Sequence, residues 1–186
     1  MCKKNARVNM CAVVAGVIVC LAAFTGKAES QSVGASQLIM VPKLAISDLQ
    51  KVSVFIHKND LTDGMKKEIN SAAAQGGLKV TIYPIKSSAD IGKNIKRLES
   101  NSILIVFPSD LFSNNSSMLY ILSRCKKKNI GVVSATKQFS TKGALMGIYK
   151  DEGGFEVALN LKMNPSYQSD FTEAVIQKVG ITKVIR

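Results

Sequence analysis

Residues 103–117 read ILIVFPSDLFSNNSS, a run of five apolar residues that passes directly into Pro, Ser, Asp and Asn. The apolar run has no polar alternation, which is typical of a strand buried on both faces of a parallel sheet covered by helices. The polar residues that follow are those that begin helices and form short loops. The stretch therefore predicts a central strand that delivers a polar loop to one edge of an α/β sheet.

Segments on both sides of this stretch alternate between strand and helix patterns. Residues 51–57 (KVSVFIH), 78–85 (LKVTIYPI) and 130–134 (IGVVS) are rich in β-branched residues and predict strands. Three intervening segments, which are 61–75, 88–98 and one that starts at 116–117, repeat apolar residues at helical spacing. Right-handed crossovers leave few alternatives for this order. We expect a doubly wound, mostly parallel, Rossmann-like or flavodoxin-like α/β lobe.

Three details refine this expectation. Asn59 and Asp60 are suitable residues to cap the helix over 61–75, and Gly76 and Gly77 to end it. Pro84 cannot donate a ladder hydrogen bond, which favours a strand end or a sheet edge for residues 78–85.

The residues from 144 onward break the alternation. Residues 144–149 (ALMGIY) and 155–161 (FEVALNL) flank the turn-forming group 150–154 (KDEGG) and predict a C-terminal β-hairpin. Residues 164–166 predict a loop and residues 169–179 a helix closed by Gly180, before a short apolar segment at 181–185.

The first residues resemble an export signal. Lys3, Lys4 and Arg7 precede an apolar run at 11–24, and Gly26-Lys27-Ala28 offers a small-residue cleavage site. The run is shorter than the roughly 20 residues that span a bilayer. We expect a cleaved signal peptide at 1–28, a lead segment at 29–50, polar and disordered at its start, a single domain at 51–186 and a periplasmic location. A lipoprotein anchored at Cys20 is the less favoured alternative, because Val19 replaces the small residue that such signals require.

Cysteine and charge limit the chemistry of the exported part. Three of the four cysteines lie in the leader, so Cys125 remains alone, either as a small buried residue or as a thiol that pairs between chains. Four of the 25 basic residues also lie there, which leaves 21 against 13 acidic residues, a net charge of about +8. Without Trp or clustered aromatic residues there is no stacking surface for nucleic acid. Anionic lipid, cell-wall polymer or an acidic protein is the expected kind of partner.

Polar residues follow three of the predicted strands. In an open α/β sheet, ligands bind beyond the carboxyl ends of the strands, where helix amides also favour an anion or a carbonyl. The sequence thus predicts a site for a small polar ligand at that edge, made by Asn59, Asp60, Ser109, Asp110, Asn114, Ser134 and Thr136. The alternative is that these residues only cap helices.

No residue pattern points to catalysis. The single histidine, His57, could be drawn with Asp60 and a serine as a triad, but no G-x-S-x-G elbow is present. Phosphate-binding glycine loops are absent, and Asp60 and Asp110 lack the further ligands that a metal needs. We therefore expect no enzyme activity, no catalytic residue, no cofactor and no metal.

Three stretches resemble one lobe of the solute-binding proteins of ABC transporters, specifically the tryptophan/tyrosine-type class. They are KVSVFIHKND with the following helix and AAAQGGLKVTIYPIKSSADI, then SILIVFPSD, then KKKNIGVVSATKQFSTKGAL. This resemblance implies an exported ligand-binding module that works with a membrane permease. Those proteins trap the ligand between two lobes, whereas the exported part of this chain has room for one, so we expect a permease, a signalling enzyme or a second copy to contribute the other wall.

The C-terminal part resembles a second family. The Gly-containing hairpin and the strand FEVALNL are similar to the ending of the YfiR-type periplasmic regulators, single exported domains of about this length. This resemblance implies a regulator that restrains an inner-membrane diguanylate cyclase by protein contact. The aromatic-rich N-terminal helix and the disulfide cysteines of that family are missing here.

Overall fold

The computed structural model describes residues 33–152 and 154–186. The predicted signal peptide at 1–28 and the beginning of the lead segment lie outside the described residues. Among the residues described, no helix has both the length and the apolar character needed to cross a membrane.

A seven-stranded sheet forms the centre of the fold, with the strand order β2-β1-β3-β4-β5-β6-β7. The first five strands in chain order run parallel, β6 runs antiparallel to β5, and β7 runs parallel to β6. The strands are β1 (Lys51–His57), β2 (Lys79–Ile85), β3 (Ile103–Val106), β4 (Gly131–Ser134), β5 (Met146–Asp151), β6 (Gly154–Asn160) and β7 (Lys183–Ile185). The mostly parallel, flavodoxin-like sheet and its C-terminal hairpin are confirmed.

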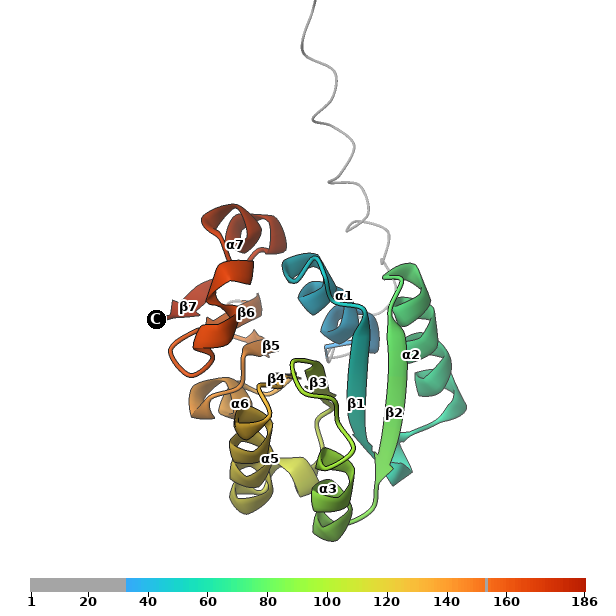
Figure 1. Cartoon of the computed structure of the whole chain (residues 1–186). Coiled ribbons are helices and arrows are strands. Elements are labelled where there is room, and N and C mark those ends of the chain that lie inside the picture. Colours follow the sequence, from blue (N-terminus) through green and yellow to red (C-terminus); the bar gives the residue numbers. More distant parts are fainter. Residues whose placement is uncertain (1–32, 153) are drawn as a thin grey trace, which may run out of the picture. The chain divides into compact units, whose positions relative to one another are not determined.

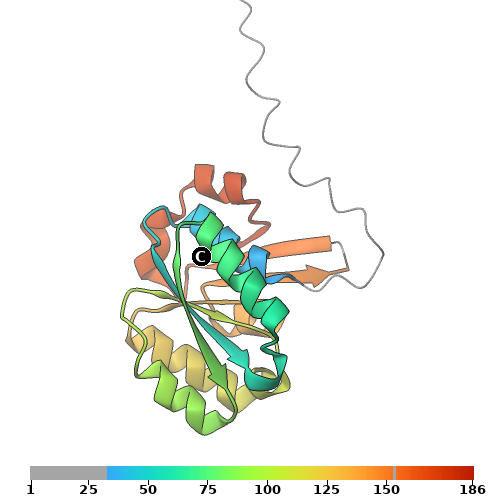
Figure 2. The same ribbon diagram turned by 90° about the vertical axis from the view of Figure 1, so that its right-hand side faces the viewer.

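Helices cover both faces of the sheet (Figures 1 and 2). One core cluster joins the sheet to α1 (Ala35–Ala45), α2 (Asp63–Gln75) and α7 (Glu173–Val179). The other joins it to α3 (Ser88–Ile95), α4 (Asp110–Ser113), α5 (Asn115–Lys127) and α6 (Lys137–Lys142). Two short 3-10 helices, η2 (Lys58–Asp60) and η3 (Pro165–Asp170), complete the described elements.

Strand β3 is as deeply buried as its apolar sequence predicts. All four of its side chains are at most 1% exposed. Ile103 and Ile105 belong to one core cluster, and Leu104 and Val106 belong to the other. The strand therefore contributes to both hydrophobic layers, because successive side chains point to opposite faces.

Helix α1 is the main element that the sequence did not predict. It lies within the 29–50 lead segment, and Leu38 and Ile39 are completely buried in the core cluster of α2 and the sheet. Pro42 sits inside the helix, where it removes one backbone donor and normally breaks helical structure. The burial of the two neighbouring apolar side chains offsets that cost.

Some helix boundaries differ from the prediction. Asn59 and Asp60 do not cap α2: they lie in η2, and the Oγ1 atom of Thr62 accepts the bond from the Met65 amide at 3.1 Å. Helix α7 begins at Glu173, because η3 occupies the preceding residues and inserts Tyr167 into the core. Gly180 adopts the left-handed conformation that was predicted to close this helix.

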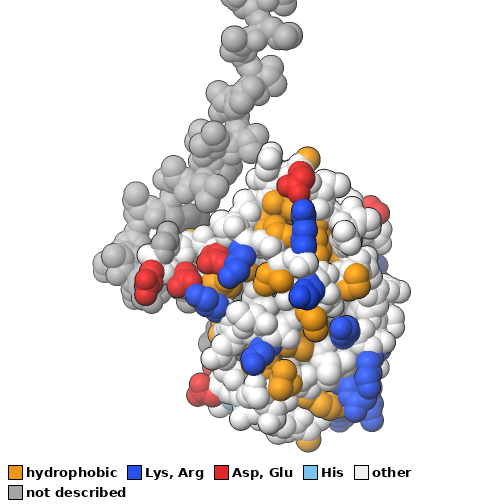
Figure 3. Space-filling view, turned by 90° about the vertical axis from the view of Figure 1, so that its left-hand side faces the viewer, with side chains coloured by type: hydrophobic (Ala, Val, Ile, Leu, Met, Phe, Trp, Pro, Cys, Tyr) orange, Lys and Arg blue, Asp and Glu red, His pale blue; other side chains and the backbone are white. Residues whose placement is uncertain are grey.

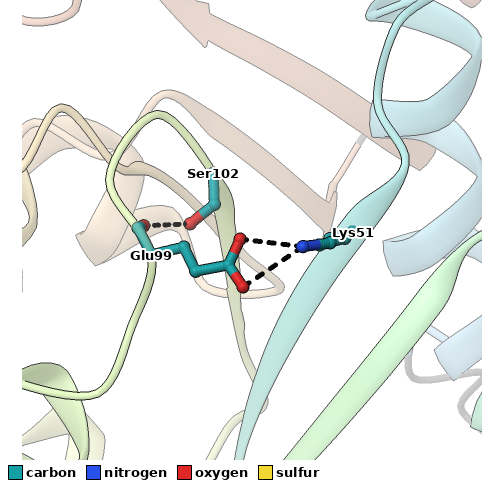
Figure 4. A network of polar contacts seen from close by, with 3 residues as sticks. All are labelled: Lys51, Glu99 and Ser102. Carbon is teal, nitrogen blue, oxygen red and sulfur yellow. Dashed lines mark hydrogen bonds and ion pairs between the residues drawn. The ribbon is translucent and has the colours of Figure 1, made fainter.

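Polar contacts join the elements at the amino edge of the sheet. The Nζ atom of Lys51 lies 3.1 Å from Oε2 of Glu99, and the Ser102 hydroxyl donates to the Glu99 carbonyl at 2.6 Å (Figure 4). The Oη atom of buried Tyr167 accepts from the Gly131 amide at 2.9 Å and donates to the Ser102 carbonyl at 3.1 Å. These bonds connect the beginnings of β1, β3 and β4, away from the edge where the ligand site was predicted.

Candidate ligand-binding site

The predicted polar loops do lie along one edge of the sheet. Strands β1, β3 and β4 are adjacent and parallel, with Phe55 opposite Val106 and Val106 opposite Ser134. Helix α2, which follows β1, covers one face of the sheet, and helices α4 and α5, which follow β3, cover the other face. The connections from these two neighbouring strands therefore leave in opposite directions. Such a reversal leaves a crevice at the carboxyl ends, where ligands of open α/β proteins bind.

Two of the predicted site residues act as helix caps. The Oγ atom of Ser109 accepts from the Phe112 amide at 3.4 Å, and Oδ1 of Asn114 accepts from the amides of Ser116 and Ser117 at 3.0 and 3.4 Å. These bonds satisfy amides that the first turn of a helix leaves without partners. The capping interpretation therefore accounts for Ser109 and for the side-chain oxygen of Asn114, but not for its Nδ2 group.

Three other predicted residues are exposed and have unused polar groups. Asn59 and Asp60 lie in η2 at the end of β1, and the carboxylate of Asp60 lies 4.0 Å from Nδ1 of His57. Asp110 is the first residue of α4, and its carboxylate makes no hydrogen bond to another described residue. These side chains are free to meet a ligand from solvent.

Ser134 and Thr136 are directed toward each other. Ser134 is completely buried, and its Oγ atom lies 3.4 Å from Oγ1 of half-buried Thr136. Thr136 precedes α6 but forms no side-chain cap bond. The Ser134 hydroxyl is thus turned into the protein, while Thr136 lies at the surface of the edge.

A groove of about 850 Å³ opens between α3 and α5 on the side of the sheet that α4 also covers. Asp110 and Asn114 lie on its wall, and the other five predicted residues do not. The wall also includes residues that the sequence did not predict, notably Lys93, Lys96 and Tyr120. Gly92 was the available signal, because a glycine inside a helix often marks a close approach of another group.

The described residues offer little reactive chemistry. No group of three or more His, Cys, Asp or Glu side chains among them is placed to hold a metal ion. Cys125 is completely buried on α5, and burial raises the pKa of its thiol to about 12, so it stays protonated at neutral pH. The arrangement of residues is suited to binding.

Comparison with known sequences gives no family model and no curated protein that matches the chain. Solved structures do match its fold, each over 81% of this chain. One is a conserved domain protein from Vibrio cholerae, with 14% identity and a TM-score of 0.68. Another is the ABC domain from Streptococcus pneumoniae in complex with L-Trp, with 12% identity and a TM-score of 0.64.

A third is the ligand-free, open form of a substrate-binding protein with adhesive properties from Clostridium difficile, with 15% identity and a TM-score of 0.59. The match covers 60%, 60% and 57% of these three chains, in the order given. This chain therefore spans about three fifths of their length. It has the α/β fold found in ABC-type solute-binding domain proteins.

Proposed function

We propose that this chain is an exported, non-catalytic binding module that recognises a small polar ligand at the carboxyl edge of its sheet. The observation that carries the proposal is the groove of about 850 Å³, with Asp110 and Asn114 on its wall, in a fold shared with solute-binding proteins. Its volume lies within the range of roughly 300–1,000 Å³ that is usual for small-molecule sites. Asn59, Asp60, Ser109, Ser134 and Thr136 extend the proposed site along the same edge.

A protein partner would complete this site. Binding sites usually cover most of a small ligand's surface, whereas the groove between α3 and α5 is open to solvent. A periplasmic location would place an inner-membrane permease or signalling enzyme within reach, and a homodimer would supply the same second wall. Size-exclusion chromatography and crosslinking distinguish these two arrangements.

One observation favours a regulatory role as the second candidate. The antiparallel β5–β6 pair, with Asp151 opposite Gly154, forms the C-terminal hairpin on which the resemblance to YfiR-type regulators rests. In that role the chain would restrain a membrane diguanylate cyclase by contact. Co-purification with such an enzyme, in place of a permease, would support this candidate.

A thermal-shift screen against amino acids and nucleotides tests the proposed function. A ligand at about 100 times its dissociation constant stabilises the folded chain by about 2.7 kcal/mol, which raises the melting temperature by roughly 5 °C or more. Asp110→Asn should reduce this shift if the ligand is cationic or a hydrogen-bond donor at that end. Asp63→Asn is the matched control, because Asp63 is also the first residue of its helix and lies outside the groove.

The proposal fails if no compound of either class raises the melting temperature. It also fails if the two groove variants, Asp110→Asn and Asn114→Asp, reduce the ligand-induced rise in melting temperature no more than the control Asp63→Asn does. Asn114→Asp keeps a side-chain oxygen for the helix cap, so its effect on binding can be separated from an effect on folding.

A further inference from the structure

The groove between α3 and α5 has an apolar lining along part of its length. Ile91 is 1% exposed at its base, and Leu111 and the ring of Tyr120 contribute further apolar surface. Gly92 lets the Tyr120 hydroxyl approach the backbone of α3, because a Cβ atom at Gly92 would lie 3.0 Å from that oxygen. The groove can therefore accept the hydrophobic body of a small molecule beside a hydroxyl group.

Two lysines give the α3 wall a positive charge. Lys93 and Lys96 are three residues apart, both are exposed, and both line the groove. Neither forms an ion pair with any residue that the structure describes. Arg124 adds a third cation near the opposite wall, 5.2 Å from the centroid of the Tyr120 ring.

The acidic residue of α3, Asp90, has other hydrogen-bond partners. The carboxylate of Asp90 accepts hydrogen bonds from the Lys86 amide at 3.1 Å and from the Ser87 hydroxyl at 3.4 Å. These bonds hold the carboxylate at the beginning of α3. Among the described residues, Asp110 is the single acidic one on the groove wall, and it begins α4 at the carboxyl edge.

The beginning of α5 is not an alternative anion site. Oδ1 of Asn114 already accepts from the amides of Ser116 and Ser117. An anion in the groove would therefore gain most from Lys93 and Lys96.

From this arrangement we infer that the groove takes an amphipathic anion, a small molecule in which a carboxylate, phosphate or sulfonate is attached to an apolar body. The inference rests on the proposed ligand-binding function and adds the chemical class of the ligand. The anionic group pairs with Lys93 and Lys96, while the apolar part lies along Ile91, Leu111 and the Tyr120 ring. Asp110 repels a second negative charge at the carboxyl edge, which selects against anions charged at both ends.

Two dyes that differ by one charged group test the inference on the full chain. The probe is 8-anilinonaphthalene-1-sulfonate, an amphipathic anion, and N-phenyl-1-naphthylamine is the same ring system without the sulfonate. We expect saturable, single-site fluorescence enhancement with the anion, weakened by added salt because exposed charges are screened. Lys93→Gln combined with Lys96→Gln should weaken binding of the anion by about fivefold and leave the neutral dye unaffected.

The matched control is the double variant Lys126→Gln and Lys127→Gln. It removes the same charge from α5 on the same side of the sheet, at positions that do not line this groove. An equal loss in both double variants, or equal binding of the two dyes, would overturn the inference. All four positions are exposed, and circular dichroism melting curves check that each variant remains folded.

The thermal-shift screen and the dye titration together distinguish failure of the proposed function from failure of the anion inference. If a ligand from the thermal-shift screen binds with Asp110 while neither dye binds, the anion class is wrong and the proposed function stands. If no compound and no dye binds, both are wrong. If Asp110→Asn strengthens binding of the sulfonate dye, the predicted repulsion at the carboxyl edge is supported; weaker binding would contradict it.

Discussion

At Gly147 in β5, the packing of α6 leaves no room for a side chain. A Cβ atom there would lie 2.6 Å from Cβ of Ser140 and 3.1 Å from Cε1 of Tyr149, and Ser140 is itself 2% exposed. Neither neighbour can move without shifting backbone or an aromatic ring. Gly147→Ala should therefore lower the free energy of unfolding by about 2–3 kcal/mol, measured by urea denaturation.

Gly64 in the first turn of α2 provides the opposite case. The nearest atom to an added Cβ is Oγ1 of Thr62 at 3.8 Å, which is ordinary contact. Gly64→Ala should leave stability unchanged or raise it by up to about 1 kcal/mol, because alanine favours the helix. Similar losses in both variants would show that the space around Gly147 is not the cause.

Burial of Cys125 makes stability depend on alkaline pH. Because burial raises the pKa of this thiol from 9.0 to about 12, the native state holds its proton more tightly than the unfolded state. The resulting stabilisation is complete below pH 9 and is lost as the pH rises toward 12. The stability difference between the wild-type chain and Cys125→Ala should narrow over this range in urea titrations at successive pH values. A constant difference would contradict the assigned cause.

At the scale of the elements, the carboxyl end of α3 is capped by Lys128, a residue that is distant in the sequence. The Nζ atom of Lys128 donates to the carbonyl oxygens of Ile95 and Lys96, both at 3.3 Å, and to that of Leu98. Basic residues near the carboxyl end of a helix normally interact with the last carbonyl groups of that same helix. The contact to α3 depends on how two helices pack, which local periodicity does not encode.

Loss of this contact should destabilise the protein. Lys128→Met is expected to lower the free energy of unfolding by about 1–2 kcal/mol, because a cation no longer satisfies the last carbonyl groups of α3. The control Lys127→Met makes the same type of substitution at the neighbouring position. It should change stability by less than about 0.5 kcal/mol, since Lys127 makes no side-chain hydrogen bond to a described residue. Chemical denaturation of both variants gives the comparison.

The elements that were predicted correctly have strong local signals. Strand β3 is a continuous apolar run, and the β5–β6 hairpin follows from the turn residues between two apolar segments. Helix α1 was not predicted because Pro42 interrupts its local pattern, and its stability comes from burial against distant residues. The beginning of α2 was misplaced for a related reason: Asn59, Asp60 and Thr62 are all competent caps, and only the geometry selects Thr62.

At the level of the whole molecule, α1 is part of the same hydrophobic core as the sheet. Leu38 is completely buried in that core, whereas Leu44 on the same helix is 48% exposed. Leu38→Ala should lower the free energy of unfolding by about 3 kcal/mol, and Leu44→Ala by less than about 0.5 kcal/mol. A single urea transition in both variants would show that α1 unfolds together with the sheet; an early separate transition would show that it does not.

The candidate site was only partly predictable, because its two halves have different origins. Parallel strands bring their carboxyl ends to one edge, so the positions of Asp110 and Asn114 followed from strand order. Lys93, Lys96 and Tyr120 reach the groove through the packing of α3 beside α5. Their sequence pattern alone is that of ordinary solvated helix surfaces.

The reversal of direction at the β5–β6 hairpin determines which edge of the sheet β7 points to. Because β6 and β7 run opposite to the other strands, Ile185 lies beside Asn160 at the end of β6, toward the amino edge of the sheet. Arg186 therefore emerges at the rim opposite the polar loops. A tag or surface linker attached to that residue would hold the molecule with the polar loops of the carboxyl edge turned outward, accessible to solutes and to other proteins.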